Sequence, residues 1–303
     1  GIRIDMKKNI LILCIMALMA CDASATMGTS GTNNNSDGTG TGGNNNGGGN
    51  NTDLPIGFSK FIDAYTDVYV SGDYVVVETT GVPNHSSPYW GAGHPNYSSP
   101  QSGMNVNPNI ITAQNFKFYI PLSPTVASSV SSTPLGSIGV SLSGVPFFNQ
   151  YGGPNNQPLD NEIASFDSYY GHPQQSGEYH YHWEPLYLTS EDKSILVGYS
   201  LDGFPIYGPT NQSDGQYPTN LDEINGHTHV TEEYPDGTYH YHATATVPYL
   251  IGGFRGQVGS SGGGGYYTNL SLIHISEPTR PRLSAYAGLG VEKKARGGGG
   301  GGG

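Results

Sequence analysis

The chain has 303 residues, a formal net charge of −12 at pH 7 and only 12% charged residues, whereas a typical soluble domain has about 25%. It is rich in Gly (46), Tyr (22) and Pro (21). The acidic balance leaves no basic stripe for phosphate contacts, so we expect no nucleic-acid binding, and frequent Gly and Pro disfavour long helices.

The first segment of the chain has the layout of a secretory leader. Residues 1–5 precede the first Met and are interpreted as upstream translation. The apolar run after Met6 is too short to span a bilayer, which needs about 20 residues, and it follows two lysines as in a signal peptide. The sequence LMAC ending at Cys21 resembles a lipoprotein box. Residues 6–21 are therefore predicted to be a lipoprotein signal peptide with Cys21 lipidated; an ordinary signal peptide cleaved nearby is the alternative.

This leader predicts a location in the bacterial cell envelope, periplasmic or at the cell surface, with a lipid anchor in the membrane as one partner. Both cysteines of the chain, Cys14 and Cys21, lie within it. The mature domain therefore has neither a disulfide nor a thiolate ligand, although its predicted compartment is oxidising.

The composition divides the rest of the chain into four parts. Residues 22–53 are mainly Asn, Gly, Thr and Ser and are expected to form a disordered linker. Residues 54–258 form the predicted domain and residues 259–269 a Gly-rich tail. Residues 270–280 read LSLIHISEPTR, which resembles one translated frame of a transposon-type sequencing adapter, and the final glycines resemble translated poly-G. We expect residues 270–303 to be an adapter artefact and exclude them from functional arguments.

Within residues 54–258 the hydrophobic pattern favours strands. VYVSGDYVVVETT (68–80) predicts two strands around a Gly turn, and NFKFYIPL (115–122) alternates like a half-buried strand. We therefore predict a mostly β domain, a sandwich or a barrel-like double sheet.

Two segments of this domain repeat one another. IGVSLSGVPFFN (138–149) aligns with VGYSLDGFPIYG (197–208), and each is followed by Gly-His and then by Gly-X-Tyr-His-Tyr-His. The matching order predicts an internal duplication over about 138–182 and 197–242, arranged as a pseudo-twofold pair. Asp202, whose counterpart is Ser143, is interpreted as a turn-forming residue.

Seven histidines lie between residues 172 and 242. In a strand, alternate side chains share a face, so His180 and His182 should point one way and Tyr179 and Tyr181 the other, with the tyrosines toward the core. Neutral imidazoles are favoured ligands of Zn, Cu, Ni and Fe. We predict a transition-metal site, with Zn or Cu as the leading candidates, where the histidines of both copies converge at the repeat interface. The predicted ligands are His172, His180, His182, His227, His229, His240 and His242. His85 and His94 receive no predicted role.

Nearby carboxylates leave catalysis open. They could be further ligands, partners of the imidazoles, a general base or ordinary loop acids: Asp167, Glu178, Glu184, Asp222, Glu223 and Asp236. If the protein is an enzyme, a metal-activated water with Glu178, Glu184 or Asp222 as base is one route, and copper redox chemistry is another.

Several motifs together resemble one bacterial family. GHPQQSGEYHYH, GYSLDGFPIYGP, DEINGHTH, YPDGTYHYH and IGGFRG resemble, in this order, the YHYH-domain family over about residues 107–256. The resemblance implies a secreted or cell-surface protein, without implying an activity. It also implies cysteines near Tyr169, Ile224 and Gly253, which this chain lacks.

Two functions follow as hypotheses. The first is an extracytoplasmic, lipid-anchored domain that binds a transition metal through paired His-X-His strands, with a small molecule or a surface polymer as its ligand. The alternative is a non-catalytic surface module that binds carbohydrate or protein through exposed aromatic residues such as Trp90 and Trp183.

Overall fold

The computed structural model describes residues 54–262. The predicted signal peptide with Cys21, the predicted linker and the predicted adapter segment lie outside the described residues. Within 54–262, strands dominate and each helix has only three or four residues, which confirms the prediction of a mostly β domain. No helix within residues 54–262 is long and apolar enough to cross a membrane.

The elements follow one another in this order: η1 (Phe58–Lys60), β1 (Thr66–Ser71), β2 (Tyr74–Thr79), η2 (Pro88–Trp90), β3 (Phe116–Pro121), β4 (Val126–Ser131), β5 (Ser137–Ser141), β6 (Pro146–Phe148), β7 (Tyr151–Gly153), β8 (Gln157–Pro158), α1 (Asp160–Ile163), β9 (Gly171–Pro173), β10 (Tyr179–Tyr181), α2 (Leu186–Thr189), β11 (Leu196–Ser200), β12 (Pro205–Tyr207), β13 (Gly226–His229), β14 (Thr238–His242), β15 (Phe254–Gly256) and β16 (Ser260–Gly262).

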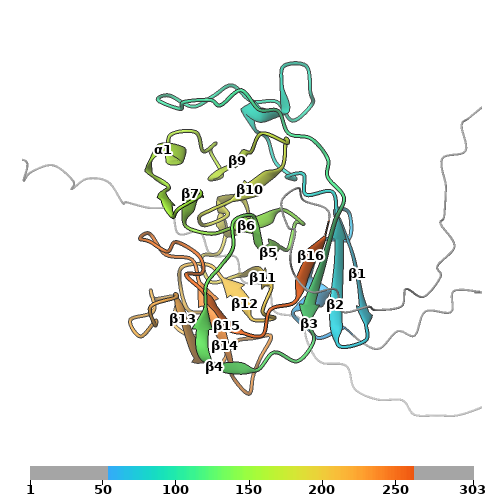
Figure 1. Ribbon diagram of the computed structural model, residues 1–303, viewed down its shortest axis with the longest axis vertical. Helices are drawn as coiled ribbons and strands as arrows, with labels where there is room; N and C mark the ends of the chain where they lie inside the picture. Colours follow the sequence, from blue (N-terminus) through green and yellow to red (C-terminus); the bar gives the residue numbers. More distant parts are fainter. Residues whose placement is uncertain (1–53, 263–303) are drawn as a thin grey trace, which may run out of the picture. The chain divides into compact units, whose positions relative to one another are not determined.

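A four-stranded antiparallel sheet has the order β1-β2-β3-β16 (Figure 1). β1 and β2 form the predicted hairpin, and its turn contains Gly72 at φ +59°, a conformation that a side chain disfavours. In β3, buried residues alternate with half-buried ones, as the sequence pattern predicts. Two further sheets are small and pair β15 with β4 and β7 with β8.

The eight-stranded sheet carries both Tyr-His-Tyr-His strands. Its order is β13-β14-β12-β11-β5-β6-β10-β9. β5 and β11 pair antiparallel at the centre, where Val140 lies opposite Tyr199. On either side the same connectivity follows: an antiparallel partner, then a parallel Tyr-His-Tyr-His strand, then an antiparallel edge strand. Corresponding strands of the two predicted copies thus occupy mirrored places in the sheet. This supports the duplication, which stays a prediction.

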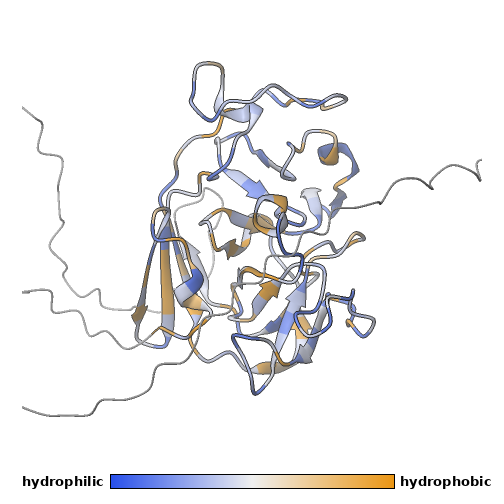
Figure 2. Cartoon of the chain, turned by 180° about the vertical axis from the view of Figure 1, so that it is seen from behind, coloured by the Kyte–Doolittle hydropathy of each residue, from blue (hydrophilic) through white to orange (hydrophobic). Residues whose placement is uncertain are grey.

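One hydrophobic core joins the two larger sheets. It includes Val77 and Phe118 of the four-stranded sheet and Val140, Phe147 and Tyr199 of the eight-stranded sheet, so the two sheets pack as in a sandwich. Figure 2 shows hydrophobic residues concentrated on the four-stranded sheet, whereas β9 and β10 are coloured as hydrophilic. The histidine strands are therefore buried without being apolar, which requires specific partners for their polar atoms.

Candidate metal centres

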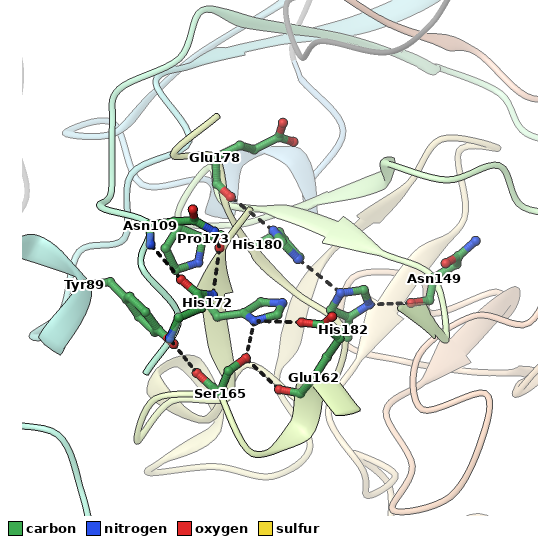
Figure 3. Close-up of polar contacts among 11 residues, drawn as sticks. Tyr89, Asn109, Asn149, Glu162, Ser165, His172, Pro173, Glu178, His180 and His182 are labelled. Atoms are coloured by element: carbon green, nitrogen blue, oxygen red, sulfur yellow. Dashed lines mark hydrogen bonds and ion pairs between the residues drawn. The ribbon is translucent and has the colours of Figure 1, made fainter. Parts of the chain in front are cut away.

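Three histidines come together at one end of the eight-stranded sheet. His172 on the edge strand β9 lies directly opposite His180 on β10, and His182 follows two residues later on the same face. The Nε2 atoms of His180 and His182 are 3.1 Å apart, and one nitrogen from each of the three rings lies within 4.8 Å of the others. We call this cluster the first triad (Figure 3).

A second triad occupies the corresponding place at the other end of the sheet. His227 on the edge strand β13 lies opposite His240 on β14, and His242 ends β14. The Nε2 atom of His227 is 2.9 Å from that of His240 and 3.2 Å from that of His242, and the last two are 3.2 Å apart. Three ring nitrogens therefore surround one point.

The remaining ring nitrogen of every triad histidine is bound to an oxygen. In the first triad, Nδ1 of His180 donates to the Glu178 carbonyl (3.1 Å), and Nδ1 of His182 donates to the Asn149 carbonyl (2.5 Å). The Ser165 hydroxyl gives its proton to the Glu162 carbonyl, so it accepts from Nδ1 of His172 at 2.6 Å. Figure 3 shows these contacts.

The second triad repeats this arrangement position by position. Nδ1 of His240 donates to the Thr238 carbonyl (3.0 Å), and Nδ1 of His242 donates to the Gly208 carbonyl (2.7 Å). His227 donates to the Asn220 side-chain oxygen at 2.9 Å. Asn220 and Ser165 each precede their histidine by seven residues. Because all six Nδ1 atoms hold the ring proton, all six Nε2 atoms present lone pairs, as metal ligands do.

Burial keeps these imidazoles neutral. Each triad histidine is at most 7% exposed. Burial lowers the pKa of His172 and His240 to about 3 and that of His182 and His242 to about 4. It also lowers the pKa of His180 and His227. At neutral pH no proton is available to bridge the facing Nε2 atoms.

One known protein family matches this part of the chain. The family model described as "YHYH protein" matches residues 117–219 and 210–256. This region of the chain belongs to the YHYH family. The matched region contains both triads and every residue that orients them. No curated protein and no solved structure matches the chain.

The tyrosines that name the YHYH family lie on the opposite face of each strand and are buried, as the alternation predicts. In the first copy, Tyr179 donates to Asp167 at 2.8 Å; in the second, Tyr239 donates to Asp222 at 2.8 Å. Each aspartate also accepts from the backbone N–H of the Gly that precedes the edge-strand histidine, Gly171 or Gly226. In each copy, the tyrosine and the aspartate therefore fix the loop that leads into the edge strand and positions His172 or His227.

The next tyrosine of each motif has a separate buried partner. The Tyr241 hydroxyl donates to Asp202 at 2.6 Å, and Asp202 also accepts from the backbone N–H groups of Arg255 and Gly256. Asp202 is thus more than a turn former, because it joins β14 to β15. The Tyr181 hydroxyl lies 2.8 Å from Nε2 of His85, so His85, to which the sequence assigned no role, anchors the first copy.

The prediction of one shared site at the repeat interface is wrong. Each triad draws all its histidines from one predicted copy, because the parallel Tyr-His-Tyr-His strands lie on opposite sides of the central β5–β11 pair. The histidine face is also buried rather than presented to solvent. Of the seven predicted ligands, six form the triads. His229 is in neither; its ring stacks beside His227 at 5.8 Å and its Nδ1 bonds the Val230 carbonyl.

The candidate bases have different environments. Asp222 holds the His227 loop, and Glu184 pairs with Thr189 and Lys193, so both have structural partners. Glu178 lines the space beside the first triad, and burial raises its pKa to about 7, but Figure 3 shows its carboxyl group turned away from the imidazoles. Glu223 and Asp236 belong to neither triad.

The two triads differ in the space beside them. The first opens on a cavity of about 800 Å³, to which all three of its histidines contribute. The hollow beside His240 and His242 is too narrow for a water molecule. The sequence does not predict this difference, because the cavity is also lined by residues that are distant in the chain, such as Asn107, Asn109 and residues 151–154.

Proposed function

We propose that the protein is an extracytoplasmic, lipid-anchored metal-binding protein that holds one transition-metal ion, Zn or Cu, in each triad. The observation that carries the proposal is the convergence of the His227, His240 and His242 Nε2 atoms to within 3.2 Å, with every Nδ1 proton engaged elsewhere.

Without an ion this arrangement is costly. Three buried lone pairs face one another, and the lowered pKa of His240 opposes protonation. A metal ion removes the conflict, because it accepts all three lone pairs. Ligand nitrogens at about 2.0–2.1 Å from a tetrahedral Zn lie roughly 3.3 Å from one another. The Nε2 separations of 2.9–3.2 Å in the second triad are close to this value.

The ligand set also fits a particular class of site. Three histidines without a thiolate match sites that keep one coordination position for water or another molecule, whereas structural zinc sites have four protein ligands. The oxygen partners on every Nδ1 match the outer partners that orient metal-bound histidines. Both features occur twice in one chain, which favours metal binding over two chance groupings of buried histidines.

The envelope location rests on the sequence. The leader ending at Cys21 supports lipidation and anchoring at a membrane, and the linker 22–53 would hold the domain away from it. Labelling of growing cells with an alkyne fatty acid tests this: the wild type should be labelled, and Cys21→Ser should not. A labelled Cys21→Ser variant would refute lipidation at this position.

Metal binding is tested by elemental analysis of the purified protein after loading with Zn or Cu and removal of excess metal. We expect two ions per chain. The paired variants His180→Ala/His182→Ala and His240→Ala/His242→Ala should each retain one. His229→Ala is the matched control, because this histidine stacks beside the second triad without belonging to it, and it should retain two. A wild-type protein that holds no metal after loading refutes the proposal.

A further inference from the structure

The first triad has a feature that the second lacks: access to a cavity. All three ligand histidines, His172, His180 and His182, are among the residues that line the space of about 800 Å³. Small-molecule sites typically enclose about 300–1,000 Å³. A metal held by three histidines keeps a position for a further ligand, and at the first triad that ligand has a cavity to occupy.

The lining of the cavity indicates the charge of this ligand. None of the lining residues is Lys or Arg, and the acidic side chains are Glu162 and Glu178, of which Glu178 is only partly ionised at neutral pH because burial raises its pKa to about 7. A negatively charged group placed away from the metal would find no cation among these side chains and would lie within a chain of net charge −12. Apart from the metal ion itself, the cavity therefore offers no charge that would balance a phosphate or a carboxylate.

The uncharged polar groups that line the cavity indicate which functional groups the ligand has. Five carboxamides line the cavity: Asn107, Asn109, Asn149, Gln174 and Gln175. Each carboxamide can both donate and accept hydrogen bonds, as each hydroxyl of a sugar does. Phe148, Leu135 and Pro173 supply apolar surface on the same walls, which suits the C–H faces of sugar rings. Small-molecule sites combine these two elements, apolar walls and a few polar groups that fix orientation.

We propose that the first triad is a ligand-binding metal centre whose cavity takes a neutral, hydroxyl-rich molecule of one or two sugar rings, with one ligand oxygen on the metal. The second triad holds its metal without such a ligand. This inference rests on the proposed metal binding and assigns different roles to the two sites.

The test is calorimetric titration of the metal-loaded protein with N,N′-diacetylchitobiose, a neutral disaccharide. We expect one binding site per chain and at least tenfold weaker binding to the metal-free protein. The anionic sugar glucose 6-phosphate should bind no more tightly than glucose, its neutral counterpart of the same size.

Matched variants show where on the protein the disaccharide binds. His180→Ala/His182→Ala should lose binding, and His240→Ala/His242→Ala should keep it. Leu135→Trp narrows the cavity from a side chain that is 42% exposed, so it should preserve folding and both metals while weakening sugar binding at least tenfold. This variant separates loss of the cavity from loss of the fold.

The outcomes distinguish the two proposals. A protein that takes no metal refutes the proposed function. A protein that holds two metals but does not bind the disaccharide overturns the inference alone. If glucose 6-phosphate binds more tightly than glucose, the assignment of a neutral ligand is overturned. Equal losses in the two double-alanine variants, or unchanged binding by Leu135→Trp, overturn the placement in this cavity.

Discussion

Asn220 offers the sharpest test of the second triad, because it acts on the metal only through His227. Its side-chain oxygen accepts the Nδ1 proton of His227 at 2.9 Å, and its side chain lies at the surface. Asn220→Ala removes this acceptor without opening a buried cavity. The change should therefore alter the orientation and basicity of one ligand and leave the fold intact.

The size of the effect follows from the role of the partner. Loss of an outer partner of a metal-bound histidine typically weakens metal binding 10–100-fold, or about 1.4–2.7 kcal/mol. Because water can reach Asn220 and replace its oxygen in part, we expect a loss near tenfold. Asn220→Asp supplies a charged acceptor at the same place and should restore or exceed the parent affinity.

The assay is competition with a chelating dye, carried out in the His180→Ala/His182→Ala background so that only the second site binds. Ser165→Ala, made in the His240→Ala/His242→Ala background, is the counterpart for the first site and should weaken metal binding there, because it removes the acceptor on His172. If Asn220→Ala binds metal as tightly as its parent, the assignment of the Nδ1 proton is wrong, and with it the argument from facing lone pairs.

Three further predictions concern stability. Gly226→Ala would drive a Cβ into the Tyr239 hydroxyl and ring and should cost about 1–3 kcal/mol, seen as a lower Tm; an unchanged Tm would contradict the packing described. Tyr241→Phe leaves buried Asp202 without its hydroxyl donor and should cost about 1–3 kcal/mol, whereas Tyr217→Phe, at a side chain that is 70% exposed, should cost nothing measurable. Burial holds the pKa of His182 and His242 at about 4, below the 6.5 of an unfolded chain. The unfolded state thus binds more protons, and the metal-free protein should lose stability as pH falls from 6.5 toward 4, by about 2 kcal/mol per histidine at pH 5. Urea unfolding at pH 7 and pH 5 checks this, and equal stabilities would contradict it.

Local patterns were enough to predict part of the fold and most of the ligands. The β1–β2 hairpin and the alternation in β3 follow from strand periodicity and a turn glycine. The grouping of the histidines follows from the period of two within a strand, because this spacing alone puts His180 beside His182 and His240 beside His242.

The partition into two triads could not be predicted in the same way, because it depends on strand order. The repeat indicates equivalent units, but only the central pairing of β5 with β11 sends the two Tyr-His-Tyr-His strands to opposite ends of the sheet. The acceptors on His180 and His182 are backbone carbonyls, which no side-chain motif marks. Ser165 and Asn220 do share one signal, their equal distance before a Gly-His pair, which an alignment of the two copies could have revealed.

The position of His172 and His227 on the two outermost strands would give each proposed metal ion a mechanical role. β9 and β13 are the edges of the eight-stranded sheet, and each contributes one triad histidine. The inner neighbour β10 contributes His180, and the inner neighbour β14 contributes both His240 and His242. An ion bound across them cross-links the last hairpin on either side, closing a short loop as a disulfide does. The residues after Cys21 include no cysteine. Metal occupancy would thus protect both edge strands from fraying, and amide hydrogen exchange in β9 and β13 should slow when metal is added.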